Sequence, residues 1–220
     1  RKMVEEDANL PRGEMTARRM SEEFWQIPPL MLLWRVMEAR PRNHLRRLDT
    51  TFYTGTATVH WTHTMDRRAT GWLGDEFHAF FRECLIHAGF RFGLWSPAYC
   101  LMPDHIHLVW SGVGRSSDQL RATRWLRRRI NEALQGRGIR LQKQAYDRVL
   151  RPADRERFAF EKMMAYVIAN PLRAGLAGES LALKQWPWRG AILSGYPELS
   201  WKASPDSFCW DRYWKLFYQA

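Results

Sequence analysis

The sequence predicts an α+β domain in which helices pack on an antiparallel sheet, with an extension at each end of the chain. Two observations support this fold class. Short runs rich in β-branched and aromatic residues, the usual composition of strands, alternate with longer segments in which apolar residues recur at helical spacing. These segments follow the order strand, helix, strand, strand, helix, strand, and one more helix comes after them.

The first three elements lie between residues 51 and 101. Thr51–Thr62 is rich in Thr, Val and aromatic residues and is predicted to be a strand. Asp75–Ala88 carries apolar residues at helical spacing, and Gly89 is placed to end this helix. Phe90–Leu101 is predicted to be the second strand.

The next two elements follow after a turn. His105–Trp110 is predicted to be the third strand, with a continuous apolar run at its end. Ser117–Gln135 is predicted to be a helix that is capped by Ser116 or Ser117 and ended by Gly136.

The last elements complete a known arrangement. Tyr146–Arg151 is predicted to be a short fourth strand, and Pro152 opens a helix that runs to about Asn170. The whole order is that of the split βαβ, ferredoxin-like pattern, with an antiparallel sheet and helices on one face. We therefore divide the chain into an N-terminal extension (1–45), a central domain (46–180) and a Trp-rich C-terminal extension (181–220).

The composition suits a folded, basic protein. Hydrophobic residues make up 45% of the 220 residues, which is enough for a core. Lys and Arg number 34 against 23 Asp and Glu, a net charge of +11. Such a balance favours nucleic acid as a partner, because basic side chains displace the counterions of phosphates. A basic protein with no such partner is the other interpretation.

Cysteine usage and hydropathy bear on the compartment. The three cysteines, Cys84, Cys100 and Cys209, form no Cys-x-x-Cys pair, so a disulfide framework is not expected and a reducing cytoplasm is the predicted location. The most apolar stretch, Ile27–Met37, is too short to span a bilayer, and we expect no membrane role.

His105 and His107 are candidate metal ligands. Residues i and i+2 of a strand point to the same side, so the two imidazoles are expected to lie next to each other, with Ile106 turned into the core. Adjacent imidazoles form half of a metal site. A pair of surface histidines on an edge strand would show the same pattern.

Tyr166 and Asn170 are the second candidate group. They are four residues apart near the end of the last predicted helix and so share a face. Pro171 places Asn170 at the helix terminus. If that helix packs against the third strand, the phenol and the amide can meet the two imidazoles. Otherwise Tyr166 is a core residue and Asn170 a cap.

A basic stripe runs along the predicted helix Ser117–Gln135. Arg121, Arg124 and Arg128 share one side, and Arg127 and Arg129 reinforce them. A stripe of this kind is either a solvated helix face or a surface that follows a phosphate backbone.

Two segments resemble single-tyrosine HUH transposases. The stretch Leu101–Val109, LMPDHIHLV, resembles their His-hydrophobic-His segment. The stretch Tyr166–Leu176, YVIANPLRAGL, resembles their tyrosine helix in the form found in REP-associated tyrosine transposases. The similarity covers about residues 48–178. This sequence departs from the family pattern at two places: Asp104 stands where Asn is more usual, and the segment Leu141–Gln144 replaces a Trp often found before the fourth strand.

The resemblance implies a fold and an activity. The fold would be a ferredoxin-like HUH domain, and the activity that of a single-stranded DNA endonuclease and strand transferase acting at hairpins. Tyr166 would attack a DNA phosphate to give a 5′-phosphotyrosine. His105, His107 and Asn170 would hold a divalent metal, Mg²⁺ or Mn²⁺. The partner would be single-stranded or hairpin DNA, contacted by the basic stripe, and the protein would be a monomer or homodimer.

Two other interpretations compete with this one. The first is a domesticated protein that binds hairpin DNA or RNA and no longer cuts it. The second is an unrelated metal-dependent hydrolase built on the His-x-His pair, in which Tyr166 has a structural role. A covalent complex between protein and DNA is expected only for the transposase-like enzyme.

Overall fold

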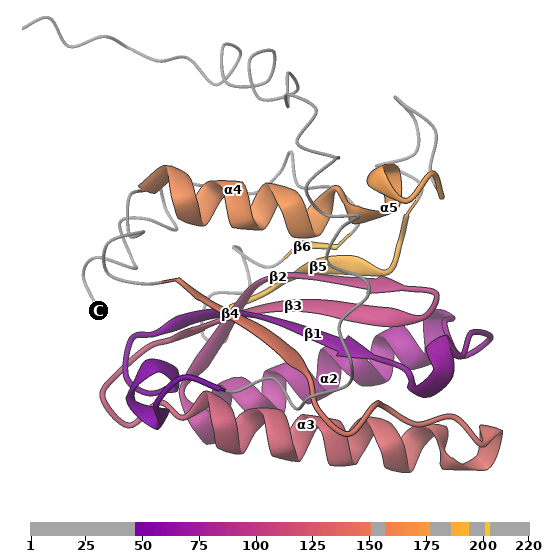
Figure 1. Cartoon of the computed structure of the whole chain (residues 1–220), viewed down its shortest axis with the longest axis horizontal. Coiled ribbons are helices and arrows are strands. Elements are labelled where there is room, and N and C mark those ends of the chain that lie inside the picture. Colours follow the sequence, from indigo (N-terminus) through magenta and orange to yellow (C-terminus); the bar gives the residue numbers. More distant parts are fainter. Residues whose placement is uncertain (1–46, 151–156, 177–185, 194–200, 203–220) are drawn as a thin grey trace, which may run out of the picture. The chain divides into compact units, whose positions relative to one another are not determined.

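The computed structural model describes residues 47–150, 157–176, 186–193 and 201–202 (Figure 1). The N-terminal extension predicted for residues 1–45 lies outside the described residues. Of the C-terminal extension predicted for residues 181–220, two short segments are described. The division into an extension, a domain and a second extension therefore stays a prediction.

A six-stranded antiparallel sheet forms the centre of the fold. Its strand order is β4-β1-β3-β2-β5-β6. The first four strands in the chain have the order that the ferredoxin-like pattern requires. The strands are β1 (Thr58–Thr64), β2 (Leu94–Met102), β3 (His105–Gly112), β4 (Tyr146–Leu150), β5 (Arg189–Ile192) and β6 (Trp201–Lys202).

Helices cover both sides of this sheet (Figure 1). The helices α2 (Asp75–Phe92) and α3 (Gln119–Leu134) pack on one face, and α4 (Arg157–Ile168) packs against β2 and β3 on the other. The four-residue helix α5 (Asn170–Arg173) follows α4. The predicted fold class is confirmed, but the expectation that the helices lie on one face is wrong for α4.

The reason is visible in the side chains of the central strands. Alternate residues of β2 and β3 are apolar on both sides, so each face needs a cover. Ile106 and Leu108 belong to the core beneath α2 and α3, whereas Cys100 and Val109 belong to a second core beneath α4. Since all of these residues are fully buried, the sheet is covered on both sides around the third strand.

Two of the predicted boundaries were wrong because of local turn chemistry. The helix α2 continues through Gly89 to Phe92, and Gly93, with a φ of 63°, ends it in the left-handed conformation that glycine adopts readily. The predicted strand from Thr51 begins instead with a 3-10 turn, Thr50–Tyr53, and the strand proper starts at Thr58. Two further 3-10 turns span Asp66–Arg68 and Gln135–Arg137.

The cap of α3 also differs from the prediction. Asp118 accepts a hydrogen bond from the backbone N–H of Arg121 at 2.9 Å and caps the helix. Ser117 cannot serve there, because its hydroxyl donates to the Gly93 carbonyl and accepts from the backbone of Val113. Within the part of the chain that the structure describes, the helices are all too short or too polar to cross a membrane.

Candidate active site

The third strand presents its two histidines to the same side of the sheet. Ile106 is fully buried in the core beneath α2 and α3, so the neighbours His105 and His107 face α4. The Nε2 atoms of the two imidazoles lie 2.9 Å apart. The predicted pair of adjacent imidazoles is therefore present.

Two further side chains orient these rings. The carboxylate of Asp104 accepts a hydrogen bond from Nδ1 of His105 at 2.6 Å, and Arg68 lies 3.1 Å from the second oxygen of that carboxylate. On β1, His60 places its Nε2 atom 3.0 Å from Nδ1 of His107. The result is a continuous row of hydrogen-bonded groups: His60, His107, His105 and Asp104.

Burial keeps the three imidazoles neutral. It is the largest cause that lowers the pKa of His107 well below its usual value, and the positive charge that His60 and His105 can carry adds to this effect. Burial also lowers the pKa of His60 to about 4. The pKa of His105 is lowered by burial as well, although the Asp104 carboxylate acts in the opposite direction. Neutral imidazoles are the form that binds metals.

The proton positions in this row decide whether a metal fits. Because Asp104 accepts from Nδ1 of His105, the Nε2 atom of that ring carries a lone pair. A metal would need the tautomer of His107 in which Nδ1–H donates to His60, so that both Nε2 atoms offer lone pairs. Two nitrogen ligands at right angles, each about 2.1 Å from an ion, are about 3 Å apart, which agrees with the observed spacing.

Among the described residues, no further histidine or carboxylate is placed as the third ligand. Across residues 47–150, 157–176, 186–193 and 201–202, no group of three or more His, Cys, Asp or Glu side chains is placed to hold a metal ion. The set predicted from the sequence takes its third donor from an amide, Asn170, which is a donor of a different type. Asn170 is close enough for a hydrogen bond with His107, which raises the pKa of that imidazole and so opposes the effect of burial.

Tyr166 comes from α4 and lies over the imidazoles. Apolar residues of this helix, including Met164 and Val167, are fully buried against the sheet and fix the helix in place. The Tyr166 ring is partly exposed, and its centre lies 5.8 Å from the ring centres of both His60 and His107. The tyrosine is therefore held next to the candidate ligands and is still open to solvent.

Asn170 reaches the site by a route that differs in detail from the prediction. The helix α4 ends at Ile168, and Asn170 begins the separate helix α5, whose first turn tolerates Pro171. The Asn170 amide donates to the Tyr166 carbonyl at 2.8 Å. This bond ties the amide to the helix that carries the tyrosine, and the four residues Tyr166, Asn170, His105 and His107 meet at one place.

The structure also reveals neighbours that sequence reasoning missed. His60 is one, and strand alternation in Thr58–Thr64 could have placed it on the same side as Thr62, which pairs with His107. Arg173 is the other: its guanidinium carbon lies 4.8 Å from the centre of the Tyr166 ring. Its spacing of seven residues from Tyr166, close to two helical turns, is a signal that was available in the sequence.

The arginines of the predicted basic stripe lie elsewhere. Arg121, Arg124 and Arg128 are exposed on α3, which packs on the opposite face of the sheet from α4. Arg127 is partly buried, its guanidinium donates to the Gln142 carbonyl, and burial lowers its pKa to about 10. The structure thus does not bring the stripe to the imidazoles, and its contact with DNA stays a prediction.

A solved structure of similar fold provides a comparison. It is a REP-associated tyrosine transposase bound to a REP hairpin, which matches 67% of this chain and 81% of its own with a TM-score of 0.55. The two chains share the fold. Their sequence identity is 18%, so the likeness concerns architecture. No protein-family model matches the sequence, and no curated protein matches it either.

Proposed function

We propose that this protein binds single-stranded DNA at a hairpin, cuts it with Tyr166 as the nucleophile, and can rejoin strands. The observation that carries the proposal is the position of the Tyr166 ring, 5.8 Å from the centres of two imidazole rings. The net charge of +11 supports a nucleic-acid substrate. The bound hairpin in the transposase of similar fold supports a hairpin as the site of action.

The proposed reaction exchanges one phosphodiester for another. The Tyr166 oxygen attacks a DNA phosphorus, a bond forms between them, and the bond from phosphorus to the 3′ oxygen breaks. The phenol loses its proton and the 3′ oxygen gains one, which leaves a 5′-phosphotyrosine and a free 3′-OH. Because the new ester replaces the old one, a 3′-OH can attack in turn and join two strands.

Each neighbouring residue has a part in this proposal. His105, His107 and Asn170 would hold Mg²⁺ or Mn²⁺, which supplies positive charge that polarises the phosphate. Asp104 accepts a hydrogen bond from Nδ1 of His105, which leaves the lone pair of its Nε2 atom for the ion that would bind there. Arg173, beside the Tyr166 ring, would bind a non-bridging phosphate oxygen and offset charge that develops during attack.

A labelling experiment tests both the nucleophile and the polarity of the cut. The protein is incubated in Mn²⁺ with single-stranded hairpins labelled at either the 5′ or the 3′ end, and then denatured. A 5′-phosphotyrosine retains the fragment that lies 3′ to the cut, so only the 3′ label should stay with the protein. Retention of the 5′ label instead would mean that the linkage has been assigned the wrong way round.

The alternative is a protein that binds hairpin DNA or RNA without cutting it. It is favoured by the exposed arginines of α3, which lie on the opposite face of the sheet from α4 and would bind a phosphate backbone without any part of the Tyr166 site. The same experiment separates the two functions. Tight hairpin binding with no covalent complex at any Mn²⁺ or Mg²⁺ concentration would favour the alternative.

A further inference from the structure

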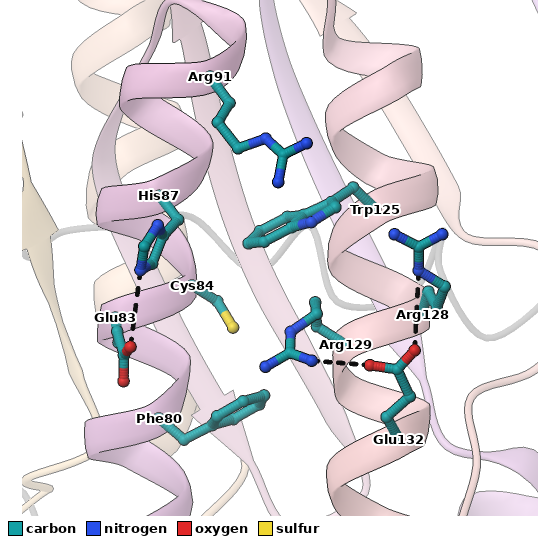
Figure 2. Close-up of a pocket in the computed structure, with 9 residues that line it drawn as sticks. All are labelled: Phe80, Glu83, Cys84, His87, Arg91, Trp125, Arg128, Arg129 and Glu132. Carbon is teal, nitrogen blue, oxygen red and sulfur yellow. Dashed lines mark hydrogen bonds and ion pairs between the residues drawn. The ribbon is translucent and has the colours of Figure 1, made fainter.

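A hollow of about 390 Å³ lies between α2 and α3 (Figure 2), and its lining residues do not include those of the site around Tyr166. The sheet separates the two places, because α2 and α3 cover one face and α4 the other. The volume lies within the range of small-ligand sites, about 300–1,000 Å³. It suits one nucleotide or a molecule of similar size.

The hollow combines flat aromatic rings with guanidinium groups. Trp125 is partly buried between the two helices, and the ring of Phe92 lies 6.1 Å from it, centre to centre. The guanidinium of Arg91 lies 5.7 Å from the Trp125 ring centre, and that of Arg129 lies 5.9 Å from the Phe80 ring centre. Figure 2 shows Phe80 and Arg91 of α2 and Trp125 and Arg129 of α3 converging between the two helices.

The residues that line the hollow carry more positive than negative charges. Arg128 and Arg129 share a single carboxylate, Glu132, at 3.7 and 2.8 Å. Glu83 lies 3.6 Å from His87. Among the described residues, no carboxylate lies within ion-pairing distance of Arg91, so its positive charge is available to a ligand.

A second hollow of about 650 Å³ continues this surface around α3. It shares Arg128 and Glu132 with the first and adds Arg124, Arg127 and Arg140. The two hollows together present six arginines against two glutamates. A long anion could therefore follow the surface from one hollow to the other.

We infer that the hollow between α2 and α3 binds an unpaired nucleotide of single-stranded DNA, with the base against Trp125 and the phosphates at Arg91 and Arg128. Aromatic rings flanked by arginines are the usual means of holding a single strand without sequence preference, since every base has a face that can stack. This inference rests on the proposed function in taking single-stranded DNA as the substrate. It adds a second contact, remote from the reacting phosphate.

The test uses the full-length protein and a 15-nucleotide thymidine strand that cannot form a hairpin, in EDTA so that no cutting occurs. Binding is measured by fluorescence anisotropy at several salt concentrations. A second strand of the same length without bases separates stacking from attraction to phosphates. A third strand, in which one thymine is replaced by 5-iodouracil, is cross-linked by light and the attached peptide is identified by mass spectrometry.

The expected result has three parts. Trp125→Leu should weaken binding of the thymidine strand about tenfold and leave the strand without bases almost unaffected. Arg91→Gln, an exposed change with little risk to the fold, should reduce the slope of log affinity against log salt by about 0.7. The cross-link should fall on the peptide that contains Trp125. Two matched controls outside the hollow, Phe90→Ala and Arg115→Gln, should bind like the wild type.

Either of two outcomes would overturn the inference: equal affinity for strands with and without bases, or an unchanged salt slope in Arg91→Gln with cross-links elsewhere. Displacement of the strand by an acidic peptide that binds equally well to Trp125→Leu would also count against it. The proposed function is tested separately, by the covalent complex with hairpins. If the protein cuts hairpins but its hollow variants bind DNA like the wild type, only this inference is wrong. If the hollow binds DNA but the protein never forms a covalent complex with hairpins, only the proposed cutting activity is wrong.

Discussion

The two faces of the sheet surround their buried histidines with different hydrogen-bond partners. On the face towards α4, His107 has both of its ring nitrogens within hydrogen-bonding distance of another imidazole. On the face towards α3, His63 is fully buried, and its Nδ1 atom meets the guanidinium of Arg127 at 3.5 Å. Burial lowers the pKa of both residues. The comparison teaches that burial alone does not distinguish a candidate metal ligand from a structural histidine, and that the partners of the ring do.

The faces also differ in what they offer to DNA. The side towards α4 holds neutral imidazoles and a single arginine, Arg173, beside a tyrosine, whereas α3 on the other side carries several exposed arginines. If both contact the same substrate, chemistry and general affinity are divided between the faces. Substitutions on one face should then change the rate, and substitutions on the other should change salt-dependent binding.

The largest expected effect is that of Tyr166→Phe. The change removes one hydroxyl and little volume, so the fold and hairpin affinity should stay within about twofold of the wild type. Cutting should fall by more than about 10³-fold, because no other group replaces the nucleophile. Single-turnover cleavage of a labelled hairpin measures this. Tyr146→Phe, on the exposed part of β4, is the matched control. A Phe variant that cuts at the wild-type rate would remove Tyr166 from the mechanism.

The next effect concerns the metal. His105→Ala and His107→Ala should each lower cutting by more than about 100-fold, and EDTA should silence the wild type. Asn170→Ala should weaken Mn²⁺ binding less, since an amide oxygen is the weakest of the three donors. Mn²⁺ titration followed by electron paramagnetic resonance gives the affinities without relying on activity. His87→Ala, an exposed histidine of α2, is the control. Full activity in EDTA would contradict the metal requirement.

A smaller effect is expected where Asp104 supports His105. Removing the carboxylate in Asp104→Ala frees the ring to turn and to change tautomer, so Mn²⁺ affinity should fall by about 10–100-fold. Asp104→Asn, which can still accept the hydrogen bond, should recover part of the loss. Asp66→Ala serves as the control, because this carboxylate pairs with Arg140 at the surface. Equal Mn²⁺ affinity in all four proteins would mean that Asp104 does not support the site.

The smallest effect should come from the basic stripe. Replacing Arg121, Arg124 and Arg128 by Gln should flatten the dependence of log affinity on log salt by about two units, if each arginine neutralises one phosphate. The corresponding Lys variants keep the charge and should keep the slope. Stability should change little, since the apolar side of α3 is untouched. An unchanged slope in the Gln variant would identify the stripe as a solvated helix face. A loss confined to one hairpin sequence would mean that these arginines contact bases.

Features of the fold and the site could be predicted from the sequence where they depend on residues close together in the chain. The pairing of His105 with His107 follows from strand alternation, which two residues suffice to define. His60 was missed because its approach to His107 depends on the pairing of β1 with β3, across more than forty residues. Gly89 and Gly93 look equivalent in sequence, and the structure shows that Gly93, with its left-handed φ of 63°, is the one that ends the helix. The strand Arg189–Ile192 has no alternation of its own and forms by pairing with β2.

The position of the strand Arg189–Ile192 late in the chain affects the order in which the structure forms during synthesis. The buried guanidinium of Arg189 donates to the Ile168 carbonyl at 3.2 Å, at the end of the helix that carries Tyr166. About 20 residues separate the two positions, so a ribosome working at about 5–20 residues per second synthesises Arg189 one to four seconds after Ile168. Until then the end of the tyrosine helix lacks this support. In a nascent chain, the end of the helix that carries Tyr166 would therefore become fixed later than the other residues around the imidazoles.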